Sequence, residues 1–138
     1  ILQNNLNIFS KDQENPIITP SMINNYVKHG LVSSPIKKKY NKEHLAHLFV
    51  ICILKKILSI SDISESLRLI KKLYSVEDGY NIFCDELEDS LKSTFDKNYT
   101  KKNDILDSEI REIATLKAIT SAFANCILVD RLISMREK

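Results

Sequence analysis

Three adjacent lysines, Lys37, Lys38 and Lys39, are the residues best suited to a defined chemistry, namely contact with a polyanion. They follow a Ser-Ser-Pro-Ile stretch and precede Tyr40, and residues 31–42 include no acid to neutralise them. Ammonium groups in an extended loop can contact phosphates, and each contact steepens the salt dependence of nucleic-acid binding. A charged loop that only keeps the protein soluble is the alternative.

A short helix is predicted directly before this loop. Thr19 has a side-chain oxygen suited to the N-cap position, and Pro20 is a preferred first helical residue. Gly30 follows Lys28 and His29, where a left-handed glycine commonly ends a helix. The pattern predicts a helix of about ten residues between Thr19 and Gly30.

The two faces of this helix differ in chemistry. The apolar face consists of Met22, Ile23, Tyr26 and Val27, and the polar face of Ser21, Asn24, Asn25 and Lys28. The polar face has no acid; Asn can pair in bidentate fashion with adenine, and Ser or Lys can reach base edges or phosphates. Such a face suits a helix in the DNA major groove, although a plain solvated face has the same composition.

These residues define a set of candidate DNA contacts. Those expected to face bases are Ser21, Asn24, Asn25 and Lys28, and those expected at phosphates are Tyr26, Lys37, Lys38, Lys39 and Tyr40. Tyr26 also belongs to the apolar face, so only its hydroxyl would reach the surface.

The next helix is predicted to form the centre of the fold. Asn41 can cap it, and its pattern runs from Lys42 to about Leu58. Seven consecutive apolar residues, from Leu48 to Leu54, require cover on most sides, yet they are too few to span a bilayer.

Further helices are predicted on both sides of this pair. Ile1 to Phe9 has the spacing of the tail of an amphipathic helix, and Ser59 or Ser61 can cap a helix after the central one. Ser75 and Asp78 then resemble a capping box. The helix after Ser75 is expected to turn Tyr80, Phe83, Leu87, Leu91 and Phe95 inward and Asp85, Glu86, Glu88 and Asp89 outward.

The last helix is the longest and the most broadly apolar. Asp107 or Ser108 can cap it, and it can run to about Met135, on the order of 40 Å. Its middle, Ile113 to Val129, requires cover nearly all round, either from the rest of the domain or from a second copy of the chain. Cover by a second copy is favoured, because DNA-binding proteins commonly bind two half-sites as dimers.

Composition fits a helical, soluble domain. The 138 residues suffice for one core, and the 2 glycines and 3 prolines favour helices over hairpins. Residues 1–75 hold 11 basic and 5 acidic residues, a balance of +6, whereas residues 76–138 hold 9 and 13, a balance of −4. A basic front half and an acidic back half indicate a polyanion-facing half and a half with another role.

The cysteines and the start of the chain indicate the cellular compartment and the extent of the protein. Cys52, Cys84 and Cys126 are expected to be buried, reduced thiols, which fits a cytoplasmic protein. Because the chain opens with Ile1 rather than Met, it is interpreted as a fragment of a longer protein.

No enzyme, cofactor or metal site is predicted. His44 and His47 lie one turn apart, with Glu43 four residues before His47, and this group could hold a metal ion on one face, but no further ligand follows at a recognisable spacing. A phosphate-cradling glycine loop and a Ser/His/Asp arrangement are both absent from the sequence.

The runs ITPSMINNYVKHGLV and PIKKKYNKEHLAHLFVICILKKILSISDI resemble an uncharacterised bacterial family, domain of unknown function number 1836. That family in turn looks like the MerR-type helix-turn-helix regulators. The MerR-like frame consists of Tyr26, Gly30 and Leu31, then Lys39 and Tyr40, then the helix opening from Asn41 to Leu48. The likeness covers roughly residues 17–65, and Asn24 stands where such regulators usually have arginine.

The resemblance implies a winged-helix-like body and a cytoplasmic location. The expected fold is all-α with a very short β wing, as a single helical domain over residues 1–138. Within it, a MerR-like winged helix-turn-helix occupies 1–65, and a helical bundle with a long C-terminal helix, serving as the dimerisation region, occupies 66–138. The expected function is that of a DNA-binding transcriptional regulator. Its partners would be double-stranded DNA and a second copy, with no membrane. The alternative is a non-enzymatic protein-interaction module on the same fold.

Overall fold

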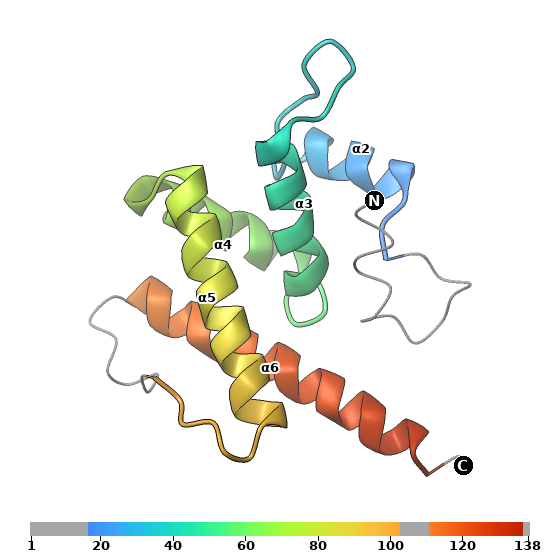
Figure 1. The fold of residues 1–138 in the computed structure, drawn as a ribbon. Coiled ribbons are helices and arrows are strands. Elements are labelled where there is room, and N and C mark those ends of the chain that lie inside the picture. Colours follow the sequence, from blue (N-terminus) through green and yellow to red (C-terminus); the bar gives the residue numbers. More distant parts are fainter. Residues whose placement is uncertain (1–16, 103–110, 137–138) are drawn as a thin grey trace. The chain divides into compact units, whose positions relative to one another are not determined.

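Helices account for most of the structure, a computed structural model that describes residues 17–102 and 111–136. In chain order they are α2 (Pro20–Lys28), α3 (Lys42–Leu54), α4 (Ile60–Leu73), α5 (Val76–Phe95) and α6 (Arg111–Ser134) (Figure 1). Within the described ranges the single β feature is an isolated bridge between Ile36 and Lys39. The all-α prediction is therefore confirmed. The helix predicted at Ile1 to Phe9 and the caps predicted at Asp107 or Ser108 lie outside the described residues.

The chain divides into two compact units, Ile1–Lys71 and Lys72–Lys138. The division falls in the last turn of α4, a few residues after the boundary expected at residues 65 and 66. The first unit holds α2, α3 and most of α4, and the second holds α5 and α6.

The predicted signals set both ends of α2. The Thr19 hydroxyl accepts a hydrogen bond from the Met22 N–H at 3.2 Å, and Pro20 is the first helical residue. At the other end Gly30 has φ of +73°, and its N–H donates to the Val27 carbonyl. The Leu31 N–H donates to the Tyr26 carbonyl, which completes a Schellman motif. Leu31 and Val32 follow directly and are buried.

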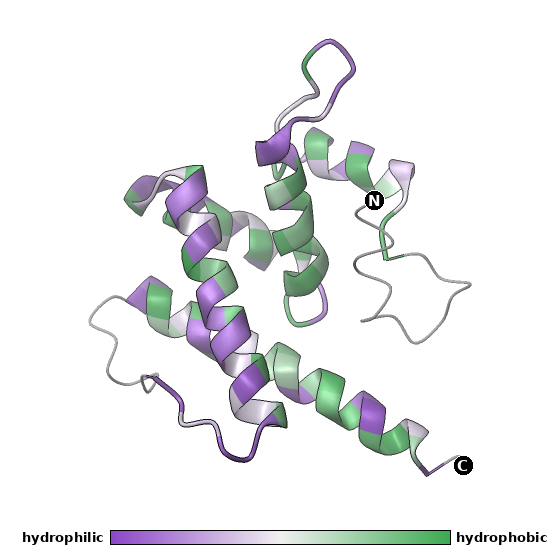
Figure 2. Ribbon diagram, viewed as in Figure 1, coloured by the Kyte–Doolittle hydropathy of each residue, from purple (hydrophilic) through white to green (hydrophobic). Residues whose placement is uncertain are grey.

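The α3 helix forms the core of the first unit, as its apolar run predicts. Within Leu48 to Leu54 every residue except Phe49 is buried, and α3 is largely hydrophobic beyond its first turn in Figure 2. The predicted end near Leu58 is wrong, because α3 ends at Leu54. Lys56 and Ile57 instead donate to carbonyls three residues back, which tightens the chain into a turn.

Side-chain caps also begin α4 and α5. The Ser59 hydroxyl accepts from the Asp62 N–H at 3.1 Å, and the Ser75 hydroxyl accepts from the Asp78 N–H at 3.1 Å. Of the two predicted caps for α4, Ser59 is therefore the one used.

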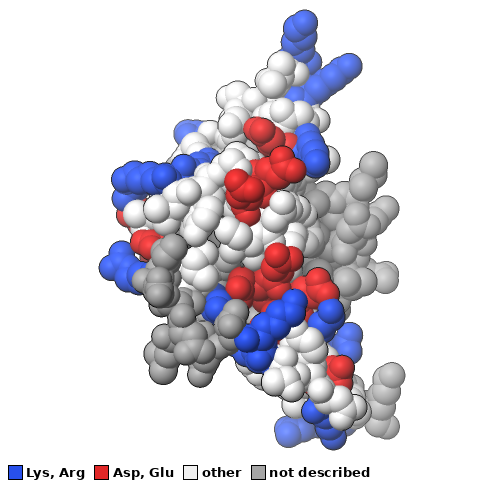
Figure 3. Space-filling model, turned by 60° about the vertical axis from the view of Figure 1, so that its left-hand side comes forward, with Lys and Arg blue, Asp and Glu red and all other residues white. Residues whose placement is uncertain are grey.

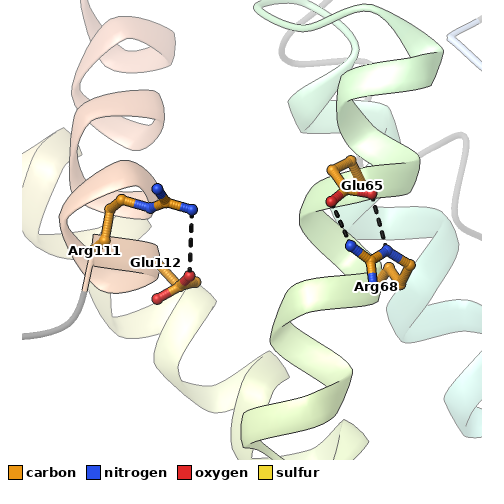
Figure 4. A network of polar contacts seen from close by, with 4 residues as sticks. All are labelled: Glu65, Arg68, Arg111 and Glu112. Carbon is orange, nitrogen blue, oxygen red and sulfur yellow. Dashed lines mark hydrogen bonds and ion pairs between the residues drawn. The ribbon is translucent and has the colours of Figure 1, made fainter.

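Ion pairs on α4 and α6 are local to each helix. Figure 4 shows Glu65 with Arg68, at 2.5 Å, and Arg111 with Glu112, at 4.0 Å. The side chains of the first pair are more than half exposed, as is that of Arg111. Pairs so exposed contribute little to stability, because water screens them.

The second unit is a hairpin in which α5 packs against α6. Phe83 and Leu87 of α5 and Phe123 and Ile127 of α6 are buried. A polar contact lies inside this layer, where the Ser90 and Thr120 hydroxyls are 2.9 Å apart.

The outward position predicted for Asp89 is wrong. Asp89 is only 7% exposed, and its carboxylate accepts a hydrogen bond from the Tyr99 hydroxyl at 2.7 Å. The Lys102 N–H lies 3.4 Å from the same oxygen. The segment after α5 therefore folds back and supplies donors to a carboxylate that helical periodicity alone assigned to water.

Candidate nucleic-acid interface

The exposed face of α2 is the one predicted from periodicity. Ser21, Asn24, Asn25 and Lys28 are all exposed, whereas Met22, Ile23 and Val27 are half-buried and Tyr26 is buried. The first turn of α2 has no acidic residue, and its last turn carries Lys28. The four polar side chains therefore form an accessible face with two amides, a hydroxyl and an ammonium group. We call this set the α2 polar face.

Tyr26 does not join that face. It is 4% exposed, and burial, with a smaller contribution from nearby Cys52, raises the pKa of its hydroxyl. A phosphate needs an accessible donor, so the geometry assigns Tyr26 to the core of the first unit.

The three lysines lie around a two-residue hairpin turn. The Ile36 N–H donates to the Lys39 carbonyl at 3.0 Å, and the Lys39 N–H donates to the Ile36 carbonyl at 2.9 Å. Lys37 and Lys38 between them have φ of +49° and +64°. Positive φ at both central residues defines a type I′ turn, which normally carries Asn-Gly. We call residues 36–39 the lysine turn.

The side chains of the lysine turn are open to solvent. All three lysines and Tyr40 are exposed, with Tyr40 at 39%. The loop stands beyond the ends of α2 and α3 in Figure 1, and basic side chains project there at the top of Figure 3. The short β wing expected here is reduced to the single bridge between Ile36 and Lys39.

His44 fixes the loop to the start of α3. Its Nδ1 accepts a hydrogen bond from the Asn41 N–H at 3.0 Å, while the Asn41 side chain accepts from the His44 N–H at 3.1 Å. Its Nε2 lies 3.1 Å from the Ser34 carbonyl oxygen. A carbonyl oxygen can only accept, so Nε2 is the donor in the contact with Ser34. Nδ1 also lies 2.6 Å from the Asn41 Oδ1.

The sequence analysis did not predict this role of His44 and considered the residue only as a metal ligand. The pattern that would have found it is Asn-x-x-His, a capping box with His in place of Glu. His47 instead contacts the Glu43 carbonyl of its own helix at 2.9 Å, and burial lowers its pKa. Across the described ranges no three His, Cys, Asp or Glu side chains lie close enough to hold a metal ion.

The cysteines differ in burial. Cys52 is buried on α3, and burial raises the pKa of its thiol to about 11. Cys84 and Cys126 are half-buried, and all three are free thiols. The expectation that all three thiols are buried therefore holds only for Cys52.

One described helix, α6, is long and apolar enough to cross a membrane by length and composition alone. About a third of its most apolar 18-residue stretch is buried in the protein. Core helices of soluble proteins meet the same criterion, so this observation by itself carries little weight.

Comparison with known proteins places the chain in a family. No curated protein and no solved structure matches it. One family matches residues 1–83, which include the α2 polar face, the lysine turn, all of α3 and α4, and the start of α5. This match extends past the stretch that carries the resemblance in the sequence and covers more than half of the chain. The chain therefore belongs to the family described as domain of unknown function (DUF1836).

Proposed function

We propose that this chain is a cytoplasmic DNA-binding transcriptional regulator with a MerR-like helix-turn-helix region. In this proposal α2 lies in the major groove and presents Ser21, Asn24, Asn25 and Lys28 to base edges and adjoining phosphates. Lys37, Lys38, Lys39 and Tyr40 contact the phosphate backbone beside the groove. Tyr26 is left out of the contact set because it is buried.

The observation that carries the proposal is the conformation of the lysine turn. Lys37 and Lys38 occupy the left-handed region, which costs an ordinary side chain roughly 1 kcal/mol relative to glycine. Lys37 and Lys38 are therefore poorly suited to this turn by conformation, yet their ammonium groups are well suited to binding phosphate. Backbone strain of this kind clusters at functional sites, where the side chain is needed despite the cost of its backbone conformation.

The α2 polar face supplies the second support. Asn24 and Asn25 carry both donor and acceptor groups, which is the pattern that reads adenine in the major groove. The absence of an acid on this face avoids repulsion from the phosphates on either side. The Schellman motif and buried Leu31 fix the chain that leads from α2 toward the lysine turn.

The first test measures affinity and salt dependence on duplex DNA. We expect Lys37→Gln, Lys38→Gln and Lys39→Gln together to reduce the slope of log K against log salt by about 3 per bound chain. The matched control replaces Lys71, Lys72 and Lys97, which are also exposed, and removes the same charge elsewhere. An equal reduction of the slope in the two triple variants would mean that DNA is held by non-specific charge attraction, and it would contradict the proposal.

The second test addresses sequence reading. The wild-type chain is used to select from a pool of random duplexes, and we expect an enriched motif. Asn24→Ala and Asn25→Ala should lose the enrichment at one or two base positions while keeping most of the affinity, since phosphate contacts remain. A wild-type selection with no enriched motif would contradict sequence-specific binding.

One observation favours a second candidate, a protein-interaction module. Ile36 in the lysine turn is 60% exposed, and Leu45 in the first turns of α3 is 47% exposed. Exposed apolar groups beside cations suit an acidic, amphipathic protein partner. Ile36→Ser discriminates the two, because it should leave DNA affinity nearly unchanged but should weaken a protein partner recovered in stoichiometric amount.

A further inference from the structure

The lysine turn itself packs against little of the first unit. All of its residues, 36–39, are exposed, so their side chains bury little surface. Before the turn the last buried residue is Val32, and after the turn Asn41 is fixed as the cap of α3. Residues 33–40 therefore need another contact to take one defined position relative to α3.

His44 supplies that contact. Its Nε2 lies 3.1 Å from the Ser34 carbonyl oxygen, and among the described residues this is the one hydrogen bond that joins residues 33–40 to the rest of the unit. Tyr40 packs edge-on against the same imidazole, with the ring centroids 5.4 Å apart. One side chain in the first turn of α3 therefore contacts the chain on both sides of the lysine turn.

Capping of α3 does not by itself explain a histidine at this position. The Asn41 N–H donates to Nδ1 of His44, and Glu or Gln, the usual residues of a capping box, would accept the same bond. A carboxylate cannot donate, whereas the imidazole also carries an N–H that reaches Ser34. Because His44 is 4% exposed, both of its ring nitrogens need partners within the protein. The second nitrogen serves the loop rather than the helix.

We propose that His44 is a positioning residue for DNA binding, which holds the lysine turn in the arrangement that meets the phosphate backbone. The inference rests on the proposed function, since that function assigns DNA contact to the three lysines. His44 is buried, so it acts through the turn and not on DNA directly. A loop that is ordered before binding loses less conformational entropy on binding, so a held turn binds more tightly than a mobile turn of equal charge.

This role predicts different effects on affinity and on salt dependence. In His44→Ala the lysines keep their charge while the turn is released, so we expect DNA affinity to fall about tenfold. The slope of log K against log salt should stay close to the wild-type value, because the same ammonium groups still displace counterions. Lys37→Gln, Lys38→Gln and Lys39→Gln together, the triple lysine variant, should instead lower the slope.

A double-mutant cycle tests whether His44 acts through the turn. Fluorescence anisotropy with duplex DNA compares the wild type, His44→Ala, the triple lysine variant and the combination of the two changes. We expect His44→Ala to cause no further loss of affinity once the three lysines are replaced, because the groups that it positions are absent. An equal loss from His44→Ala in both backgrounds would overturn the proposal, since His44 would then act on another part of the protein.

His44→Gln is the conservative variant, and it separates positioning from lost stability. Its amide has an oxygen that can accept from the Asn41 N–H and an N–H that can donate to the Ser34 carbonyl, so affinity should return to within about threefold of the wild-type value. His47→Ala is the matched control, because His47 contacts the Glu43 carbonyl of its own helix, and it should keep wild-type affinity. A folded His44→Gln that binds as weakly as His44→Ala would contradict the proposal.

The order of the turn can be measured without DNA. Heteronuclear NOE values at the Lys37 and Lys38 amides report backbone motion on the picosecond to nanosecond timescale. In the wild type and in His44→Gln they should be near those of α3, and in His44→Ala they should fall. They should also fall in His44→Glu, which keeps an acceptor for the cap but has no donor for Ser34. Unchanged values in His44→Ala would overturn the proposal.

The two kinds of measurement distinguish this proposal from the proposed function. A wild-type chain that binds no duplex DNA would contradict the proposed function, whereas the NOE values would still decide whether His44 holds the turn. A chain that binds DNA with a turn as mobile in the wild type as in His44→Ala would contradict the role of His44 alone. Circular dichroism checks that each variant is folded.

Discussion

His44 shows how one side chain can define a loop. It accepts from the Asn41 N–H, donates to the Ser34 carbonyl and is 4% exposed. The chain between its two partners contains the lysine turn. Its imidazole therefore closes the loop of six residues, 35–40, that lies between these two partners.

His44→Ala should lower the free energy of unfolding by about 2 kcal/mol, because it removes half of a capping box and the donor to Ser34. Urea denaturation measures this loss, and hydrogen exchange at Asn41 should accelerate. His47→Ala, one turn along the same helix, is the matched control and should cost about 0.5 kcal/mol or less. Equal losses would mean that His44 contributes packing alone.

Cys52 makes a prediction about alkaline pH. Burial raises the pKa of its thiol from 9.0 to about 11, so the folded state holds this proton where the unfolded state releases it. Its contribution to stability is complete below pH 9 and is lost as the pH rises through 11. With allowance for partial solvent screening, the loss should be on the order of 2 kcal/mol.

Urea denaturation between pH 8 and 11 checks this decline. Cys52→Ala should show a smaller decline, although Tyr26 keeps a share in both proteins because burial also raises the pKa of its hydroxyl. Parallel pH profiles for wild type and Cys52→Ala would show that the thiol ionises as readily when folded as when unfolded.

At the scale of elements, the lysine turn predicts a trade between stability and binding. Lys37→Asn with Lys38→Gly supplies the residues that a type I′ turn prefers, so it should stabilise the protein by about 1 kcal/mol while weakening DNA binding. Thermal unfolding and DNA titration measure the two effects. A variant that loses stability would show that lysine side chains, rather than backbone preference, hold the turn.

Gly30→Ala is the converse control for this turn. Gly30 has φ of +73°, and an added Cβ would meet no atom within 4 Å. The expected loss of about 1 kcal/mol is therefore conformational, not steric. The measured loss gives the free-energy cost of placing a non-glycine residue in the left-handed conformation in this unit.

Element starts could be predicted because their causes are local. The side chains of Thr19, Asn41, Ser59 and Ser75 each accept a hydrogen bond from the N–H three residues ahead in the sequence. A short sequence pattern includes both partners of such a bond. The exposed and buried sides of α2 followed from helical periodicity for the same reason. Asp89 did not, because its partners Tyr99 and Lys102 lie beyond the end of its helix.

The candidate site was predicted in its composition but not in its shape. The charge of Lys37, Lys38 and Lys39 can be read from the sequence. Their hairpin turn could not be predicted, because it lacks the Asn-Gly pair that is typical of a type I′ turn. The bond from His44 to Ser34 spans ten residues and pairs a side chain with a carbonyl. Backbone acceptors are present at every residue, so no residue type marks the one that is used.

At the scale of the whole molecule, the basic and acidic halves of the sequence correspond closely to its two compact units. The basic unit contains the α2 polar face and the lysine turn. The proposed function therefore assigns polyanion binding to the unit whose charge suits it.

The short reach of the bonds around the lysine turn has a consequence for how the protein folds. The bonds within the turn span three residues, the Asn41–His44 cap spans three, and the bond from His44 to Ser34 spans ten. Loops of this length close in tens of nanoseconds, long before distant segments of a chain meet. Low contact order in this region favours early formation, so the turn and its cap are expected among the first native structure to appear as the chain leaves the ribosome.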